Sequence, residues 1–278
     1  MNLGDLAQGK PTMRGFETRF QRLELKYVID DSTAAQIRRE LEPYCREDEH
    51  NASPCDLSSA PPGYLVQSLY LDSPSLAFHR AKQRGDAERL KLRVRGYLGR
   101  EFVAMEHKRR SSDIIEKTRV MVDPDQIEAA ALGFGKPLDD GPEARQLLGR
   151  FAHLVVSAGA APTLLIRYWR EAYTSRVDDY ARVTFDRRVA VQRTRAWDHE
   201  GDPARWCELE HHLSAGAPRP IVILELKCRS RVPYWISDLV RRYALRRRSF
   251  SKYSIGIHLT ASLNGSAGLM PRCGGVLR

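Results

Sequence analysis

Basic side chains alternate with aliphatic ones in the stretch RLKLRVRGY, which runs from residue 89 to residue 97. A β-strand sends successive side chains to opposite faces, so Arg89, Lys91, Arg93 and Arg95 would share one face. Cations arranged in this way can bind phosphate oxygens, arginine through two parallel hydrogen bonds and lysine as a point charge. For a single strand, a solvated outer face of a sheet is an equally good explanation.

The same alternation recurs along the chain, with charged residues two positions apart in other strand-like segments. In one closed antiparallel barrel, the charged face of every strand points into a single lumen, and the apolar faces pack against outer helices. Unit charges about 5 Å apart interact by about 3 kcal/mol at an effective dielectric near 20, so we expect an anionic occupant. The positions concerned are Arg22, Glu24 and Lys26; Glu106 and Lys108; Lys117 and Arg119; Arg170; Arg182 and Asp186; Glu225 and Lys227; and Lys252.

The net charge of the protein indicates that its ligand is an anion. The net charge of +10 favours nucleic acid, a phosphate-rich small molecule or an anionic membrane surface. The lumen of a barrel built from so few strands is too narrow for duplex DNA, and the aromatic residues among the cations are typical of barrel packing, so we expect no nucleic-acid partner. The glutamates in the same rows indicate a divalent metal, because Mg²⁺ and Mn²⁺ prefer one or two carboxylates together with phosphate oxygens. The aromatic residues are Tyr97, Tyr168, Trp169 and Tyr173.

Several other kinds of site are not indicated. The five cysteines show no CxxC spacing, and CELEHH has no second Cys/His pair, so neither a disulfide framework nor a zinc site is expected. The sequence has no P-loop, GxSxG or HExxH motif. No signal peptide or membrane-spanning run is found, which predicts a cytoplasmic protein, held at the inner face of a membrane only through a membrane-protein partner.

The elements that must position the cations are mainly strands. Strand-like alternation with few helices between the strands predicts an α+β fold, mainly antiparallel, in which a sheet or closed barrel has helices packed outside. Helices are expected from Asp31 or Ser32 to about Tyr44, and over about 124–132, 142–157 and 232–245. One domain is expected over 15–260, between flexible tails at 1–14 and 261–278.

Short motifs in this order and approximate spacing resemble the VTC domain, the catalytic domain of polyphosphate polymerases in the triphosphate tunnel metalloenzyme superfamily. They are RLELKY, LKLRVRGY, EHK, the pair Lys117 and Arg119, YWREAY, RVTFD, ILELK and FSKY. The resemblance covers about residues 16–260. It implies an eight-stranded antiparallel tunnel that binds ATP and polyphosphate with Mn²⁺ or Mg²⁺, and it implies transfer of the ATP γ-phosphate onto a polyphosphate chain.

The resemblance also assigns roles to residues of this sequence. Glu225 would be the metal ligand, and Glu24 would either assist it or pair with the cations. For Glu106 structural pairing is the favoured interpretation. The catalytic cations would be Lys26, Arg93, Arg95, Lys108, Arg170, Arg182 and Lys252, with Arg22, Lys91, Lys117 and Arg119 as further phosphate-binding residues.

Two positions depart from the pattern of the superfamily. Arg22 stands where many of the hydrolases carry the first glutamate of ExExK, which resembles the polymerase branch more than the hydrolases. Ser249 replaces a basic residue that commonly precedes the lysine of SKY by three positions, and Arg248 could compensate for it. A metal-dependent tripolyphosphate or nucleoside-triphosphate hydrolase and a non-catalytic polyphosphate sensor remain the alternatives to a polymerase.

Overall fold

One antiparallel sheet forms the body of the molecule. The computed structural model describes residues 22–52, 62–97, 99–112, 114–178, 180–209, 220–229, 231–248 and 250–265. Two short strands flank the main sheet, β2 (Cys45–Glu47) beside β7 and β9 (Cys207–Glu208) beside β8. The main strands follow the order β1 (Arg22–Asp30), β10 (Ile221–Arg229), β8 (Ala181–Arg193), β7 (Ala161–Ser175), β3 (Tyr64–Asp72), β4 (Glu88–Tyr97), β5 (Val103–Ser111) and β6 (Ile114–Val122).

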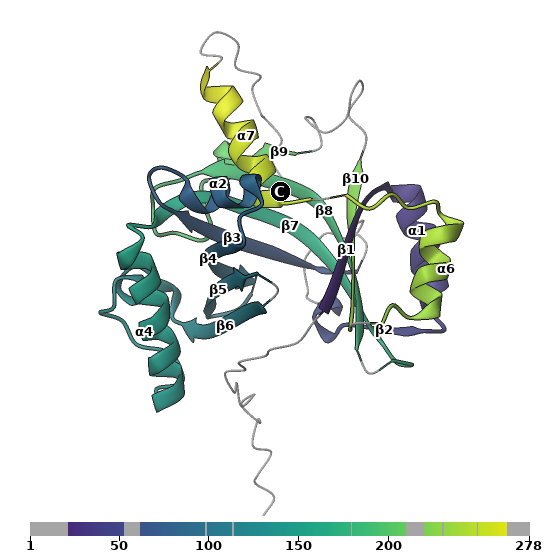
Figure 1. Ribbon diagram of the computed structural model, residues 1–278, viewed down its shortest axis with the longest axis horizontal. Helices are drawn as coiled ribbons and strands as arrows, with labels where there is room; N and C mark the ends of the chain where they lie inside the picture. Colours follow the sequence, from purple (N-terminus) through teal and green to yellow (C-terminus); the bar gives the residue numbers. More distant parts are fainter. Residues whose placement is uncertain are drawn as a thin grey trace, which may run out of the picture.

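The sheet curls into a tunnel-like shape, with β1 and β6 at its two ends (Figure 1). All the pairings are antiparallel, which confirms the predicted fold class. The predicted closure is wrong, because in the described part of the chain no ladder joins β1 to β6. An ion pair links the walls instead, with Lys108 Nζ 3.7 Å from Glu24 Oε2. The linker before α7 also bonds β1 itself, since the Arg248 N–H donates to the Lys26 carbonyl at 2.9 Å.

Backbone register brings the charged positions of neighbouring strands side by side. Lys26 lies opposite Glu225, and Arg93 lies opposite Glu106. Because side chains alternate along each strand, the same register continues across the sheet and leaves one face basic and the other apolar. The basic face carries Glu24, Lys26, Glu225, Lys227, Arg182, Asp186, Arg170, Tyr168, Ser68, Tyr70, Lys91, Arg93, Arg95, Tyr97, Glu106, Lys108, Lys117 and Arg119.

Helices pack against the sheet in three groups (Figure 1). Two of them cover the apolar face, as predicted, and the third packs on the same face as Tyr70 and Tyr168. The first comprises α1 (Asp31–Leu41) and α6 (Tyr234–Arg242), which pack beside β1 and β10 through a core that includes Ile37, Leu224 and Trp235. The second comprises η2 (Pro124–Gln126), α3 (Ile127–Ala131) and α4 (Pro142–Ser157), which pack against β5 and β6 through Phe151 and Met105. The third comprises α2 (Ala77–Arg84) and α7 (Lys252–Gly265). The turns η1 (Glu49–Ala52) and η3 (Pro203–Arg205) lie in connections.

Some local boundaries differ from those expected. The N-cap of α1 is Asp30, whose carboxylate accepts the Thr33 N–H at 2.7 Å, so the predicted cap at Asp31 or Ser32 is one or two residues late. The helix ends at Leu41. The helix α7 runs to Gly265, past the expected boundary at residue 260. No helix in the described ranges is long and apolar enough to cross a membrane.

Candidate active site on the basic face

Glu106 organises the first group of cations on the basic face. Its side chain is 2% exposed and accepts hydrogen bonds from Arg93 Nε and Arg119 Nε, both at 2.6 Å. Lys117 Nζ and Arg95 Nη1 lie 3.4 and 3.9 Å from its oxygens. Burial would raise the pKa of Glu106, but these cations, Arg93 foremost, hold it well below its usual range. Glu106 of β5 therefore acts as a fixed anion that aligns cations from the two neighbouring strands, β4 and β6.

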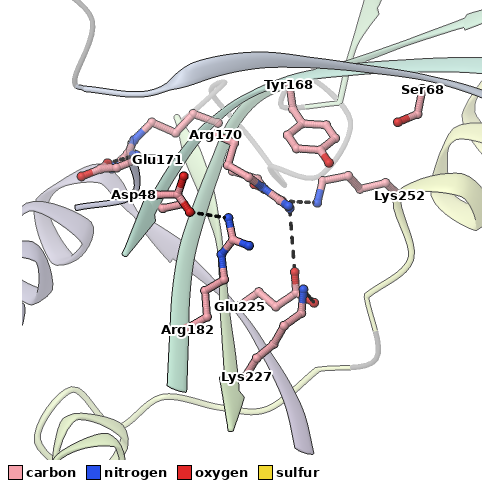
Figure 2. A network of polar contacts seen from close by, with 12 residues as sticks. Asp48, Ser68, Tyr168, Arg170, Glu171, Arg182, Glu225, Lys227 and Lys252 are labelled. Carbon is pink, nitrogen blue, oxygen red and sulfur yellow. Dashed lines mark hydrogen bonds and ion pairs between the residues drawn. The ribbon is translucent and has the colours of Figure 1, made fainter. Parts of the chain in front are cut away.

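Asp186 and Glu225 organise the second group (Figure 2). Asp186 is fully buried and accepts two hydrogen bonds from Arg170, at 2.7 and 2.8 Å, and one from Lys252 at 2.5 Å. Burial would raise the pKa of Asp186, but Arg170 and Lys252 lower it to about 2. Arg170 Nη2 also lies 3.8 Å from Glu225 Oε2.

Glu225 interacts with two lysines, one on the neighbouring strand β1 and one on its own strand β10. Lys26 Nζ lies 3.7 Å from one of its oxygens and Lys227 Nζ lies 3.4 Å away. Lys26 is closer to Glu24, at 2.7 Å, and Glu24 also pairs with Lys108. Burial would raise the pKa of Glu225, but Lys227, Lys26 and Arg170 keep it well below its usual range. Asp186 and Glu225 are therefore both ionised at neutral pH.

Tyr168 lies between the two groups. Its hydroxyl accepts a hydrogen bond from Arg95 Nη2 at 3.4 Å. The Lys252 ammonium and the Arg170 guanidinium lie over its ring, 4.6 and 5.0 Å from the centroid. Cation–π contacts of this kind hold a charge in place without neutralising it. Tyr168 thus keeps Arg95, Arg170 and Lys252 close together while all three keep their charge.

Cations exceed carboxylates on the basic face, and the neighbouring pKa values reflect this excess. Burial, together with Lys26, Lys108 and Arg93, lowers the pKa of Lys91 to about 8. Burial, with Arg119 and Arg93, lowers that of Lys117 to about 8. Burial would raise the pKa of Tyr70, yet Arg93, Arg95 and Lys91 lower it to about 8. A face that disfavours protonated lysine and favours phenolate attracts anions.

The chemistry of the acidic residues fits a divalent metal only in part. Glu225 and Glu24 both lie beside Lys26 Nζ, and together they match the one or two carboxylates by which Mg²⁺ is held beside substrate phosphates. Within the described residues, no group of three or more His, Cys, Asp or Glu side chains could hold a metal by itself. A metal at this face would therefore depend on phosphate oxygens for its remaining ligands.

The model of one protein family, described as the VTC domain, matches residues 21–261. The chain belongs to the VTC domain family. The resemblance in its sequence motifs is thereby confirmed. No curated protein matches the chain.

Solved structures of low sequence identity align with this VTC domain over most of its length. A putative adenylate cyclase from Bacillus halodurans is 8% identical with a TM-score of 0.45, covering 84% of this chain and 95% of its own. A putative adenylyl cyclase from Hippeastrum, described as having a dominant triphosphatase activity, is 13% identical with a TM-score of 0.44, covering 92% of this chain and 100% of its own. With TM-scores below 0.5, neither likeness bears on the activity of this VTC domain.

The VTC domain brings nearly all of the predicted site residues onto one face. The side chain of Arg22 lies outside the described part, although its backbone pairs with Arg229. Arg182 shares the face, but Asp48 binds its guanidinium at 2.9 Å (Figure 2). Arg248, the suggested substitute at Ser249, is exposed, and Ser249 itself lies outside the described residues.

Some residues of the VTC domain site were not assigned a role from the sequence. The sequence pattern places Asp186 and Lys227 on the charged face without assigning them a function, and it assigns Tyr168 to barrel packing. It does not single out Tyr70. The alternation by two would have included Tyr168, since it lies two positions before Arg170.

The other residues considered in the sequence are the aromatic residues of β7, the CELEHH motif and the cysteines. Trp169 and Tyr173 are buried, with Tyr173 in the core beneath α1, in agreement with a packing role for these two aromatic residues. Cys207 is buried on β9, whereas His211 and His212 of the CELEHH motif lie outside the described residues. Cys45 and Cys228 are buried free thiols.

Proposed function

We propose that this VTC domain is a polyphosphate polymerase-like phosphotransferase, which moves the γ-phosphate of ATP onto a polyphosphate chain bound at its basic face. One observation carries the proposal: cations from distant segments of the chain converge on one face and outnumber the carboxylates there. They are Lys26, Lys91, Arg93, Arg95, Lys108, Lys117, Arg119, Arg170, Arg182, Lys227 and Lys252, against Glu24, Glu106, Asp186 and Glu225.

The arginines are suited to binding and orienting a chain of phosphates. Phosphoryl transfer needs in-line alignment and charge stabilisation more than covalent help from the protein. Arg93, Arg119 and Arg170 are already fixed by carboxylates, so little side-chain entropy is lost when they bind phosphate oxygens. Each retains N–H groups beyond those bonded to the carboxylate, because a guanidinium has five.

The lysines are suited to stabilising charge during transfer. Lys26 and Lys252 are held by carboxylates near Arg170, where negative charge would gather on the transferred group. The terminal phosphate of the acceptor chain is ionised at neutral pH, so the reaction requires no strong general base. A divalent metal bound by Glu225, with Glu24, would draw charge from the leaving ADP.

A single assay distinguishes this proposal from its alternatives. Purified protein is incubated with ATP and either Mn²⁺ or Mg²⁺, and gel electrophoresis separates long phosphate polymers from orthophosphate. Polymer formation supports the proposal, and its loss in Arg93→Ala/Arg95→Ala ties the activity to the basic face. Arg145→Ala is the matched control, because Arg145 forms an exposed pair with Asp140 on the outer surface.

Three other outcomes would each overturn the polymerase. Orthophosphate without polymer would identify a metal-dependent hydrolase. Tripolyphosphate binding without turnover, measured by calorimetry, would identify a non-catalytic binding module. The absence of both binding and turnover would mean that the basic face serves another ligand.

A further inference from the structure

The helix α7 begins at the basic face, and its first two residues point in different directions. Lys252 bonds Asp186 at 2.5 Å and lies over Tyr168, so its ammonium is on the basic face (Figure 2). Tyr253, the next residue, is buried beside β3, and its hydroxyl donates a hydrogen bond to Asp72 Oδ2 at 2.7 Å. Lys252 is therefore adjacent in sequence to a residue that is held by a buried hydrogen bond.

Asp72 is a junction between three elements. It ends β3, is 1% exposed, and accepts N–H groups from Ser73, Phe78 and His79 at 2.8, 2.9 and 3.0 Å. These bonds hold the first turn of α2, and the fourth bond, from Tyr253, holds the first turn of α7. A buried carboxylate with four donors is strongly fixed, and removal of one donor leaves its oxygen undersatisfied.

The ring of Tyr253 also contacts the basic face directly. It stacks on Tyr70 with centroids 5.0 Å apart and an interplanar angle of 13°. Tyr70 in turn accepts a hydrogen bond from Arg93 Nη1 at 3.3 Å. Tyr70, Lys91 and Tyr253 line a common small cavity. Through Tyr70, the ring of Tyr253 also comes close to Arg93, by a contact that does not depend on the Tyr253 hydroxyl.

Apolar packing and the buried bond to Asp72 both hold α7 against the sheet. Gly256 lets the helix approach β7 and β8, since a Cβ there would lie 2.7 Å from Leu164 Cδ2 and 2.9 Å from Val191 Cγ1. Before the helix, residues 246–248 are exposed. In the described residues around Lys252, the Asp72–Tyr253 bond is the buried polar link between α7 and β3.

We propose that Tyr253 and Asp72 are positioning residues, which hold the first turn of α7 against β3 so that Lys252 stays on the basic face. The inference rests on the proposed function only in naming a polyphosphate as the ligand that Lys252 meets. Loss of the bond would let the first turn of α7 shift, and Lys252 would leave Asp186 for part of the time. The residues themselves contact no phosphate.

The first test measures the position of Lys252 without any ligand. Lysine side chains are acylated briefly in Tyr253→Phe and in the wild type, and mass spectrometry gives the rate at each lysine. Lys252 should react several-fold faster in the variant, while Lys108, which forms no part of the anchor, keeps its rate. An unchanged rate at Lys252 overturns the proposal, whether or not the protein is a polymerase.

The second test is a double-mutant cycle on tripolyphosphate affinity, measured by calorimetry. Tyr253→Phe should weaken binding about fivefold and Lys252→Ala about tenfold. In the Lys252→Ala background, Tyr253→Phe should have no further effect, because its effect is transmitted through Lys252. Additive effects of the two substitutions would identify Tyr253 as a structural residue alone and overturn the proposal.

A matched control and a second variant keep the test decisive. Tyr243→Phe removes a hydroxyl that donates to Glu40 at 2.5 Å between the outer helices, and should change neither Lys252 reactivity nor tripolyphosphate affinity. Asp72→Asn weakens the same anchor while keeping the side-chain shape, and should reproduce the increase in Lys252 reactivity if Tyr253→Phe folds poorly. Failure of the wild type to bind tripolyphosphate would count against the proposed function, and the acylation result would still decide the anchor.

Discussion

At the scale of single residues, the site consists of cations held in place by a smaller number of buried carboxylates. Glu106 and Asp186 neutralise part of the local charge and fix the direction of the guanidinium groups. Removing one member of such a group leaves the others buried and unpaired, which costs more than the group itself contributes. The carboxylates are therefore as informative as the cations in testing the site.

Glu106→Gln is expected to destabilise the protein by about 3 kcal/mol, because Arg93 and Arg119 lose their common partner in a buried setting. Urea unfolding at pH 7 measures the change. Tripolyphosphate should recover part of the loss by providing new acceptors. Glu88→Gln, at an exposed pair with Arg109, should change stability by less than about 0.5 kcal/mol, and an equally small effect at Glu106 would contradict the assigned role.

Glu225→Ala is expected to abolish metal-dependent turnover and to leave tripolyphosphate binding largely intact, because the phosphate contacts come from the cations. Polymer yield from ATP and Mn²⁺ measures the first effect, and calorimetry without metal measures the second. Glu24→Ala in parallel shows whether the metal needs both carboxylates. Unchanged turnover in Glu225→Ala would remove Glu225 from the mechanism.

Tripolyphosphate affinity should fall as pH rises from 7 to 9. Lys91 and Lys117 have pKa values of about 8 and lose a positive charge in this range, while Tyr70, also at about 8, gains a negative one. Each change makes the face less positive, so we expect about tenfold weaker binding at pH 9 and proton uptake on binding near pH 8. Calorimetry in buffers of different ionisation enthalpy measures both. Equal affinity at the two pH values would be evidence against these shifts.

At the scale of elements, two features decide where the cations lie: the register of the strands and the helices that cover the apolar face. The alternation in the sequence predicted β3, β4, β7 and β8 well because half-buried strands require it. It could not predict β2 or β9, since strands of three and two residues carry too few positions to show a period. Tertiary contacts with β7 and β8 create them.

Phe151→Ala in α4 should destabilise the protein by about 3–5 kcal/mol, because it leaves a cavity in the core beneath β5 and β6. Urea unfolding measures the loss. Val156→Ala, on the exposed side of the same helix, should change stability by less than about 0.5 kcal/mol. Equal effects of the two substitutions would mean that α4 does not support the sheet as described.

At the scale of the whole molecule, the net charge of +10 is concentrated in part on one concave face. Curling of the sheet brings Lys108 of β5 to Glu24 of β1, although the two strands lie far apart in the strand order. Charges gathered on such a face repel one another, so a bound polyanion should stabilise the folded state as a whole.

Saturating tripolyphosphate, at about a hundred times its dissociation constant, should stabilise the fold by about 2.7 kcal/mol. For a domain of this size that corresponds to a rise in melting temperature of about 5–10 °C, measured by calorimetry. Sulfate at the same concentration should have a much smaller effect, because it cannot bridge the two groups of cations. Equal shifts with the two anions would argue against a specific site.

The sequence by itself determined which residues share a face, because the two-residue period of a strand assigns every side chain to one side or the other. Arg93 with Arg95 and Glu225 with Lys227 follow from that rule, and the antiparallel fold follows from the scarcity of helices between the strands. Tertiary structure alone decided which carboxylate pairs with which cation, that the sheet stays open between β1 and β6, and that α7 delivers Lys252 beside Asp186. These features depend on how the sheet curls and how the helices pack on it. Both are determined by contacts between segments far apart in the sequence, so no local sequence pattern can predict them.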